Sequence, residues 1–179
     1  PPPNEEGVSL LSFEQVTTLF HEFGHALHGL LSDATYPSLS GTRVTRDYVE
    51  FPSQMMENWA GEPEVIASFA KHYLTDEPIP EDLLKKITNA SKFNQGFGTT
   101  EYVAAAYLDM AWHTQDQKIE DANVFESTTL NDLGLIPEIN SRYRSTYFAH
   151  IFAGGYSMGY YSYLWTEVLE ADAFQPFRE

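Results

Sequence analysis

Residues 13–31 read FEQVTTLFHEFGHALHGLL, and this stretch decides much of the fold. Ser12 and Gln15, at its start, form an S-x-x-Q capping box, which is typical of a helix N-terminus. Apolar residues then recur at helical spacing. They are Val16, Leu19, Phe20, Phe23, Ala26, Leu27 and Leu30. The pattern predicts a long and well-buried helix over 13–31.

Within this helix, residues 21–25 match the pattern H-E-x-x-H. Side chains four positions apart share a helix face, so His21 and His25 can offer two imidazole nitrogens to one metal ion. Zinc suits two imidazoles and a carboxylate, with one position left to water. Glu22 lies beside them and can accept a proton from that water. An ordinary solvated helix face is the alternative, but titratable groups on so apolar a helix need partners. We therefore expect one zinc ion per chain.

The third ligand must come from elsewhere in the chain. A metzincin would have a histidine at position 31, where this chain has Leu31, so that class is excluded. Among the downstream carboxylates Glu50 is the best candidate, because Pro52 suits the first turn of a helix and places Glu50 where a loop meets it. Glu57, two turns later, is expected to hydrogen-bond to a ligand histidine. The alternative for Glu57 is an ordinary helix carboxylate. His28 is expected to pack or to support a ligand residue, rather than to bind the metal itself.

The rest of the chain predicts a mainly α protein with a small sheet. Residues 32–49 are rich in Ser, Thr, Tyr, Val and Gly, and they favour a loop with one or two short β-strands. Apolar periodicity with Pro and Gly at the boundaries predicts further helices. Three of these helices follow Pro52, Pro63 and Pro80. Three more are expected over about 99–117, 123–133 and 157–173. No repeat or linker divides the chain, so residues 1–179 are expected to form a single domain.

Residues 143–165 hold a second group of candidate functional side chains. Gly154 and Gly155 can adopt backbone conformations that other residues avoid. Tyr156 and Tyr163 lie two helical turns apart, so both hydroxyls could face one site. A phenol that donates to a developing oxyanion stabilises a tetrahedral intermediate. Buried tyrosines are nevertheless often only core residues.

Composition excludes several classes of partner. The chain has 26 acidic and 10 basic residues, and its net charge of −16 argues against nucleic acid or an anionic membrane. In so acidic a chain, ion pairs are a simpler expectation for Arg142 and Arg144 than binding of a substrate carboxylate. There are no cysteines and no apolar run of membrane-spanning length. These features fit a cytoplasmic protein, and also many periplasmic ones.

Three separated motifs resemble the M3 family of zinc metallopeptidases. They are HEFGHALH at 21–28, VEFPSQ at 49–54 and YFAHIFAGGY at 147–156. The last motif, Phe-Pro-Ser-Gln at 51–54 and Ser-Gly-Thr at 40–42 are most similar to the peptidyl-dipeptidase branch. The resemblance covers nearly the whole chain and implies a zincin-like catalytic domain.

The resemblance also implies a role for each residue of the site. His21, His25 and Glu50 match the zinc ligands, and Glu22 matches the general base. The residues that match those binding substrate and stabilising the transition state are His150, Gly154, Gly155, Tyr156 and Tyr163.

The substrates implied are short peptides, from which C-terminal dipeptides would be released. General oligopeptide endopeptidase activity stays open, as does a zinc- and peptide-binding core without turnover. Enzymes of this family are several times longer, and a helical N-terminal part forms the other wall of their channel. We therefore expect this chain to be a catalytic fragment of a longer enzyme, with apolar surface exposed where the N-terminal part would dock.

Overall fold

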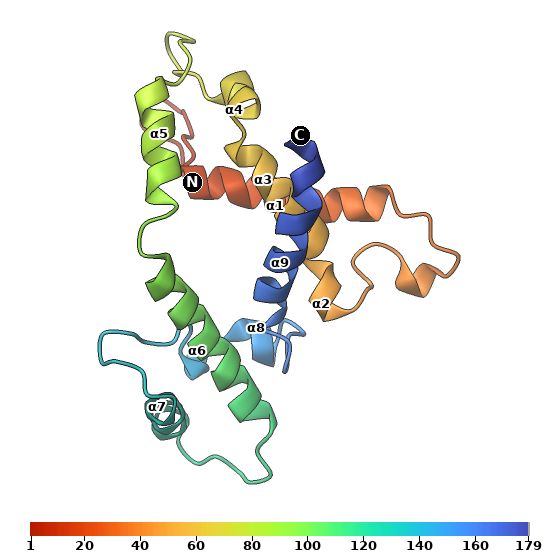
Figure 1. The fold of residues 1–179 in the computed structure, drawn as a ribbon, viewed down its shortest axis with the longest axis vertical. Helices are drawn as coiled ribbons and strands as arrows, with labels where there is room; N and C mark the ends of the chain where they lie inside the picture. The colour runs from red at the N-terminus through yellow and green to blue at the C-terminus, as the bar shows by residue number, and fades with distance from the viewer. Residues whose placement is uncertain (179) are drawn as a thin grey trace. The chain divides into compact units, whose positions relative to one another are not determined.

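The computed structural model describes residues 1–178, which form two compact units (Figure 1). The first unit contains residues 1–88 and the C-terminal segment from residue 164, and the second contains residues 89–163. The expected single catalytic domain stays a prediction.

The first unit is built mainly from helices along the first half of the chain. They are α1 (Phe13–Leu30), the short 3-10 helix η1 (Pro37–Leu39), α2 (Arg46–Val49), α3 (Phe51–Gly61), α4 (Pro63–Phe69) and α5 (Glu81–Ala90). The C-terminal segment adds most of α9 (Ser162–Phe174) and η3 (Gln175–Phe177). Apolar residues of α3, α4 and α9 form its core. They are Ala60, Ile66 and Phe174, with Val49 from α2.

Helix α1 begins as the capping box predicts. Ser12 Oγ accepts a hydrogen bond from the Gln15 backbone N–H at 3.2 Å, and Gln15 Oε1 accepts one from the Ser12 N–H at 3.0 Å. The predicted deep burial of this helix is wrong, because Gly24 is its only buried residue. Leu19, Phe23 and Leu30 are more than half exposed. Helix α3 covers one side of α1, and helical spacing places these three residues on the other side.

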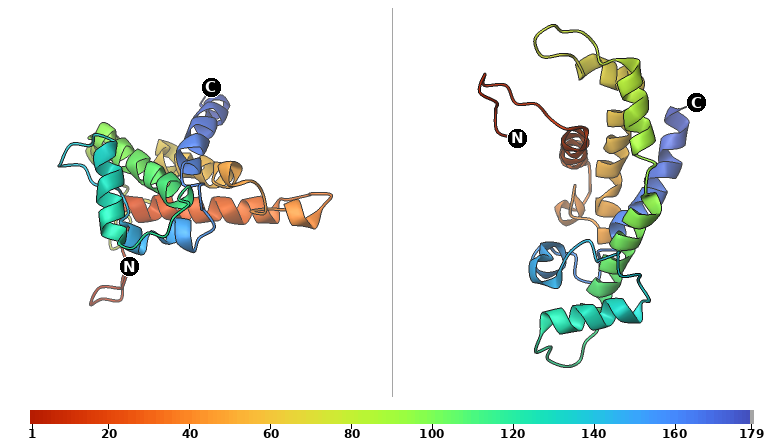
Figure 2. Two further views of the ribbon diagram at one scale, coloured as in Figure 1. Left: turned by 90° about the horizontal axis from the view of Figure 1, so that it is seen from below. Right: turned by 90° about the vertical axis from the view of Figure 1, so that its left-hand side faces the viewer.

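Helices α1 and α3 pack closely at Gly24, and Figure 2 shows the pair from two further directions. A Cβ at Gly24 would lie 2.5 Å from Ser53 Cα and 2.6 Å from the Pro52 carbonyl oxygen. Only a residue without a side chain lets the two backbones approach so closely. This contact brings the start of α3, and Glu50 just before it, beside the α1 face that carries His21 and His25.

The predicted β-sheet is absent from residues 1–178, where only an isolated bridge joins Lys71 and Pro78. The segment 32–49 instead forms η1, turns and α2. Ser32 Oγ accepts hydrogen bonds from Ser40 Oγ at 3.0 Å and from the Gly41 N–H at 3.1 Å. Ser and Gly thus close a loop locally, whereas a strand needs a neighbouring strand to satisfy its backbone. β-Propensity alone is a weak guide to such a segment.

The second unit contains α6 (Gln95–His113), α7 (Ala122–Asp132), η2 (Ser145–Tyr147) and α8 (Ala149–Phe152). Helix α6 contacts α7, and α7 contacts η2. The buried apolar residues of this unit are Tyr102, Ala104, Ala105, Leu108, Phe148, Ile151, Tyr156 and Tyr160. The helix predicted over 157–173 begins later, at Ser162, because residues 153–161 form tight turns.

Within residues 1–178, no helix combines the length and the apolar character that a membrane span requires.

Candidate functional site

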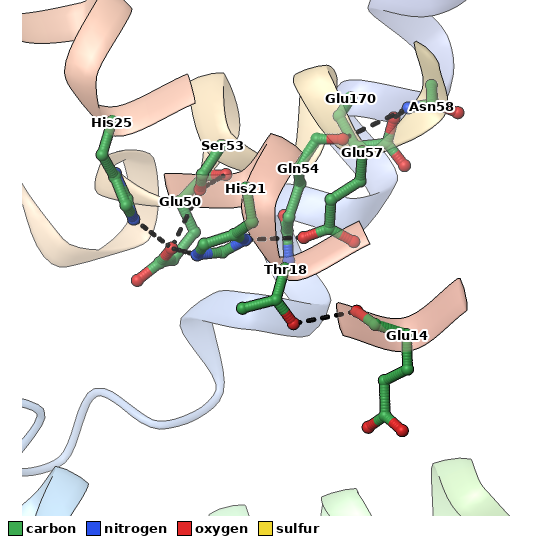
Figure 3. A network of polar contacts seen from close by, with 10 residues as sticks. All are labelled: Glu14, Thr18, His21, His25, Glu50, Ser53, Gln54, Glu57, Asn58 and Glu170. Atoms are coloured by element: carbon green, nitrogen blue, oxygen red, sulfur yellow. Dashed lines mark hydrogen bonds and ion pairs between the residues drawn. The ribbon is translucent and has the colours of Figure 1, made fainter. Parts of the chain in front are cut away.

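His21, His25 and Glu50 converge in the first unit. One donor atom from each lies within 4.8 Å of the others, and the three could hold a metal ion. Both histidines extend from α1 toward the carboxylate of Glu50 (Figure 3). Each Nε2 lies 3.2 Å from the same oxygen, Glu50 Oε2. The structure therefore brings together the three residues that the sequence predicts as ligands.

The distances from the two Nε2 atoms to Glu50 Oε2 are compatible with a shared metal. Hydrogen bonds between a charged nitrogen and a carboxylate are about 2.7–2.9 Å long, shorter than the 3.2 Å found here. In a tetrahedral zinc site with bonds of roughly 2.0–2.1 Å, neighbouring ligand atoms lie about 3.3 Å apart. Two imidazoles and one carboxylate are also a donor set that zinc accepts while a fourth position stays open.

Glu50 is 2% exposed and is the single residue between α2 and α3, so the short helix α2 precedes it where a loop was expected. Ser53, one turn into α3, donates a hydrogen bond to Glu50 Oε2 at 3.0 Å. The same hydroxyl lies 2.8 Å from the Glu50 carbonyl oxygen. A buried carboxylate without partners is strongly disfavoured, so this contact and the two histidines together hold Glu50 in place.

Glu57 makes the hydrogen bond that its spacing predicts. Its Oε1 lies 2.6 Å from Nδ1 of His21, the ring nitrogen that faces away from Glu50. A carboxylate at this nitrogen fixes the ring and leaves Nε2 facing the site. Burial lowers the pKa of His21, but the hydrogen bonds with Glu50 and Glu57 outweigh it and raise the pKa to about 9. Without a metal, His21 is therefore protonated at neutral pH.

His21 and His25 differ in the contacts of Nδ1, the ring nitrogen that does not face Glu50. The buried Nδ1 of His25 has no hydrogen-bond partner among residues 1–178.

His28, one turn further, is not part of the metal-binding group, and its ring packs edge-on against Tyr48 at 6.3 Å. Burial and the neighbouring charge of His25 lower the pKa of His28. This agrees with the expectation that His28 packs rather than binds metal.

Two residues at the back of the site were not expected from the sequence. Asn58 Nδ2 donates to the carboxylate of Glu170, which joins α3 to α9 within this unit (Figure 3). Burial raises the pKa of Glu170. Asn58 and Glu170 are 112 positions apart in the chain, and no local pattern connects them.

Glu22, the expected general base, is exposed on α1 directly after His21. Its catalytic role stays a prediction.

In the second unit, His150, Tyr156 and Tyr163 form an aromatic cluster. The rings of Tyr156 and Tyr163 stack, with centroids 5.2 Å apart and planes 21° apart. The ring of His150 lies 6.1 Å from each. Tyr143, which the sequence analysis missed, lies 5.1 Å from His150. The structure thus places the three predicted side chains together, although no local sequence pattern indicates Tyr143.

Of the two glycines before Tyr156, Gly155 has the left-handed backbone that was expected. Gly155 has a φ of +79°, which favours glycine. A Cβ at Gly154 would lie 3.0 Å from both Cα and the carbonyl oxygen of His150. The Tyr156 N–H donates to the His150 carbonyl oxygen at 3.0 Å and closes the loop. The pair therefore turns the chain sharply enough to bring Tyr156 back beside His150.

Arg144 forms the ion pair that was the simpler expectation. Its Nε donates to Oε1 of Glu126, which is 4% exposed, and Oε2 of the same carboxylate accepts the Ser145 backbone N–H at 2.6 Å. Arg144 is therefore engaged within the second unit, while the Arg142 side chain is exposed.

The model of peptidase family M3 matches residues 1–179. The chain belongs to peptidase family M3. Members of this family are metallopeptidases, which agrees with the group formed by His21, His25 and Glu50.

Several curated proteins are similar in sequence to this chain. The dipeptidyl carboxypeptidase of Escherichia coli K12 is 49% identical over 174 residues, which are 96% of this chain and 26% of the relative. Oligopeptidase A of the same organism is 40% identical over 176 residues, again 96% of this chain and 26% of the relative. The organellar oligopeptidase A of Arabidopsis thaliana is 40% identical over 184 residues, covering 99% of this chain and 23% of the relative. The chain thus spans about a quarter of the length of these relatives.

Proposed function

We propose that this chain carries the metal-binding catalytic residues of a zinc-dependent peptidase. The observation that carries the proposal is the convergence of His21, His25 and Glu50, with Nε2 of each histidine 3.2 Å from one carboxylate oxygen. These residues would hold one Zn²⁺ per chain. When bound, the ion supplies Lewis acidity, which polarises a carbonyl group and makes water more acidic.

The residues around the ligands have separate tasks. Glu57 holds the His21 ring with Nδ1–H donating to its carboxylate, so that Nε2 presents a lone pair to the site. Glu22 acts as general base, takes a proton from the attacking water and returns it to the leaving amine nitrogen. Its place directly after His21 on α1 and its match to the family motif support this role.

His150, Tyr156 and Tyr163 bind the substrate and stabilise the transition state. A phenol hydroxyl or an imidazole N–H that donates to the developing oxyanion lowers the barrier to peptide hydrolysis. Gly154 and Gly155 shape the loop that presents Tyr156. The close packing of the three rings within the second unit and their match to the family motif support the assignment.

The proposed substrates are short peptides, and release of C-terminal dipeptides is the first candidate. Identity of 49% to a protein named dipeptidyl carboxypeptidase favours this mode over general oligopeptide cleavage, for which the identity to oligopeptidase A is 40%. The remaining part of a longer enzyme would complete the substrate channel.

The test compares Glu22→Gln with Glu14→Gln, a matched change of another exposed glutamate on α1. Metal content is measured by elemental analysis, and hydrolysis of a short synthetic peptide is followed by mass spectrometry. We expect one zinc per chain in all three proteins, dipeptide products from the parent and Glu14→Gln, and no turnover by Glu22→Gln. Equal turnover in both variants would refute Glu22 as the base. Zinc binding by a parent that cleaves nothing would instead indicate a binding core.

A further inference from the structure

Asp109 is a buried carboxylate that the proposed reaction does not use. It lies on α6 and is 1% exposed. Its Oδ1 accepts the backbone N–H of Met158 and its Oδ2 that of Tyr160, both at 3.0 Å. His113, one helical turn later, places Nδ1 2.9 Å from Oδ1. Both oxygens of Asp109 are therefore engaged, and two of their three partners belong to one turn about 50 residues further along the chain.

The turn that Asp109 holds has an unfavourable backbone. Met158 has a φ of +56°, in the left-handed region that side chains disfavour. The Gly159 N–H closes the turn by donating to the Tyr156 carbonyl oxygen at 2.8 Å. A strained residue persists only where its surroundings fix it, and the bonds from Asp109 to both neighbours of Gly159 supply that constraint.

This turn connects two members of the aromatic cluster. Tyr156 lies just before it, and Tyr163 lies just after it, at the start of α9. Tyr160, inside the turn, is packed as well: the Tyr102 hydroxyl donates to its carbonyl oxygen, and the two rings stack at 5.0 Å. The separation and tilt of the Tyr156 and Tyr163 rings therefore depend on the conformation of residues 157–160.

We propose that Asp109 is a positioning residue for the aromatic cluster. Its charge holds the turn 157–160 through two backbone N–H groups, and the turn sets how Tyr156 and Tyr163 lie beside His150. Asp109 itself touches no reacting group. The inference rests on the proposed function, because the cluster matters for turnover only if it binds the substrate.

An ordinary buried acid that merely stabilises the fold would behave differently, and Glu126 provides the comparison. Like Asp109 it is almost fully buried in the second unit, pairs with a basic side chain and accepts a backbone N–H. Its partners are Arg144 and Ser145, outside the turn. A change at Glu126 should therefore weaken the unit without releasing residues 157–160.

The test compares Asp109→Asn with Glu126→Gln, using residue-resolved amide hydrogen exchange in the whole chain. Asparagine has one acceptor oxygen, and its NH₂ group would face a backbone N–H. We expect the Met158 and Tyr160 amides to exchange about tenfold faster in Asp109→Asn, the equivalent of one lost charge-assisted hydrogen bond, and to change little in Glu126→Gln. Unchanged exchange in Asp109→Asn, or equal acceleration in both variants, would overturn the proposal.

Peptide hydrolysis gives a second readout. Loss of cluster geometry should lower kcat/KM about tenfold in Asp109→Asn, because the cluster is proposed both to bind the substrate and to stabilise the transition state. A parent without turnover would defeat the proposed function, while hydrogen exchange would still decide whether Asp109 holds the turn.

A double variant keeps the test decisive if Asp109→Asn folds poorly. Met158 is 44% exposed, and glycine adopts its left-handed backbone without strain. Adding Met158→Gly to Asp109→Asn should restore folding and recover part of the protection at the Tyr160 amide. A double variant no better protected than Asp109→Asn, or one that also fails to fold, would show that the carboxylate does not act through this turn.

Discussion

Replacement of Gly24 by alanine should separate the proposed metal ligands. A Cβ at this position would lie 2.5 Å from Ser53 Cα, whereas ordinary van der Waals contact begins at 3.4 Å. The difference between these two distances, about 0.9 Å, is the separation of α1 and α3 that would restore ordinary contact. Both atoms nearest the new methyl group belong to backbone, so no side chain can turn away to relieve the clash.

The movement acts directly on the donor atoms, because His21 and His25 are on α1 and Glu50 is at the start of α3. If it is fully transmitted, the distance from each Nε2 to Glu50 Oε2 grows from 3.2 Å to 3.2 + 0.9 = 4.1 Å. Zinc bonds of roughly 2.0–2.1 Å do not span that separation in a tetrahedral site. We expect zinc affinity to fall at least about tenfold and the metal-free chain to lose about 1–3 kcal/mol of unfolding free energy from overpacking.

The measurement is zinc affinity by competition with a coloured chelator, together with a urea melt of the metal-free protein. Gly29→Ala is the control, because it adds the same methyl group to the same helix and meets no described atom within 4 Å. It should bind zinc as the parent does and gain up to about 1 kcal/mol, since alanine favours helix over glycine. Parental affinity in Gly24→Ala would refute the argument that this close approach sets the ligand spacing.

Three further outcomes follow from the same site. Glu50→Ala should abolish stoichiometric zinc in elemental analysis, because it removes a ligand, and a Glu62→Ala control on the same unit should keep it. Glu57→Gln should weaken zinc binding by about 10–100-fold in the same chelator assay, because a neutral amide orients His21 less firmly; unchanged affinity would exclude that role. The pKa of His21 is raised from 6.5 to about 9 in the metal-free chain. Its contribution to stability is therefore complete below pH 6.5 and is lost as pH rises through about 9, so urea melts after chelator treatment should show falling stability over that interval. Zinc affinity should rise over the same interval, because binding must displace the proton from His21; a flat profile would contradict the raised pKa.

The elements that the sequence predicts well are those specified by neighbours along the chain. The capping box of Ser12 and Gln15 starts α1 where expected, and the four-residue spacing of His21 and His25 places both on one face. The expected loop-to-helix position of Glu50 and the two-turn spacing of Glu57 were also sufficient to select residues that the structure places beside the histidines.

The wrong predictions concern properties that depend on distant partners. The Ser-, Thr- and Val-rich segment 32–49 has strand-forming composition, but a strand forms only where another strand pairs with it. The apolar periodicity of α1 predicts that the face carrying Leu19, Phe23 and Leu30 is buried, yet these residues are exposed because α3 covers the opposite face. Periodicity identifies which residues share a face, and it does not supply the partner for that face.

By itself, the sequence determined the helix that carries the two histidines, the chemistry of the candidate metal site and the family of the chain. Only the tertiary structure decided the close approach of α3 to Gly24, which sets the spacing of the histidine and carboxylate donor atoms. It alone also decided the hydrogen bonds between Asp109 and a turn about 50 residues away. The physical reason is the range of the interactions. Caps and helical spacing act within a few residues, whereas close backbone packing and buried hydrogen bonds join segments whose separation along the chain carries no local pattern.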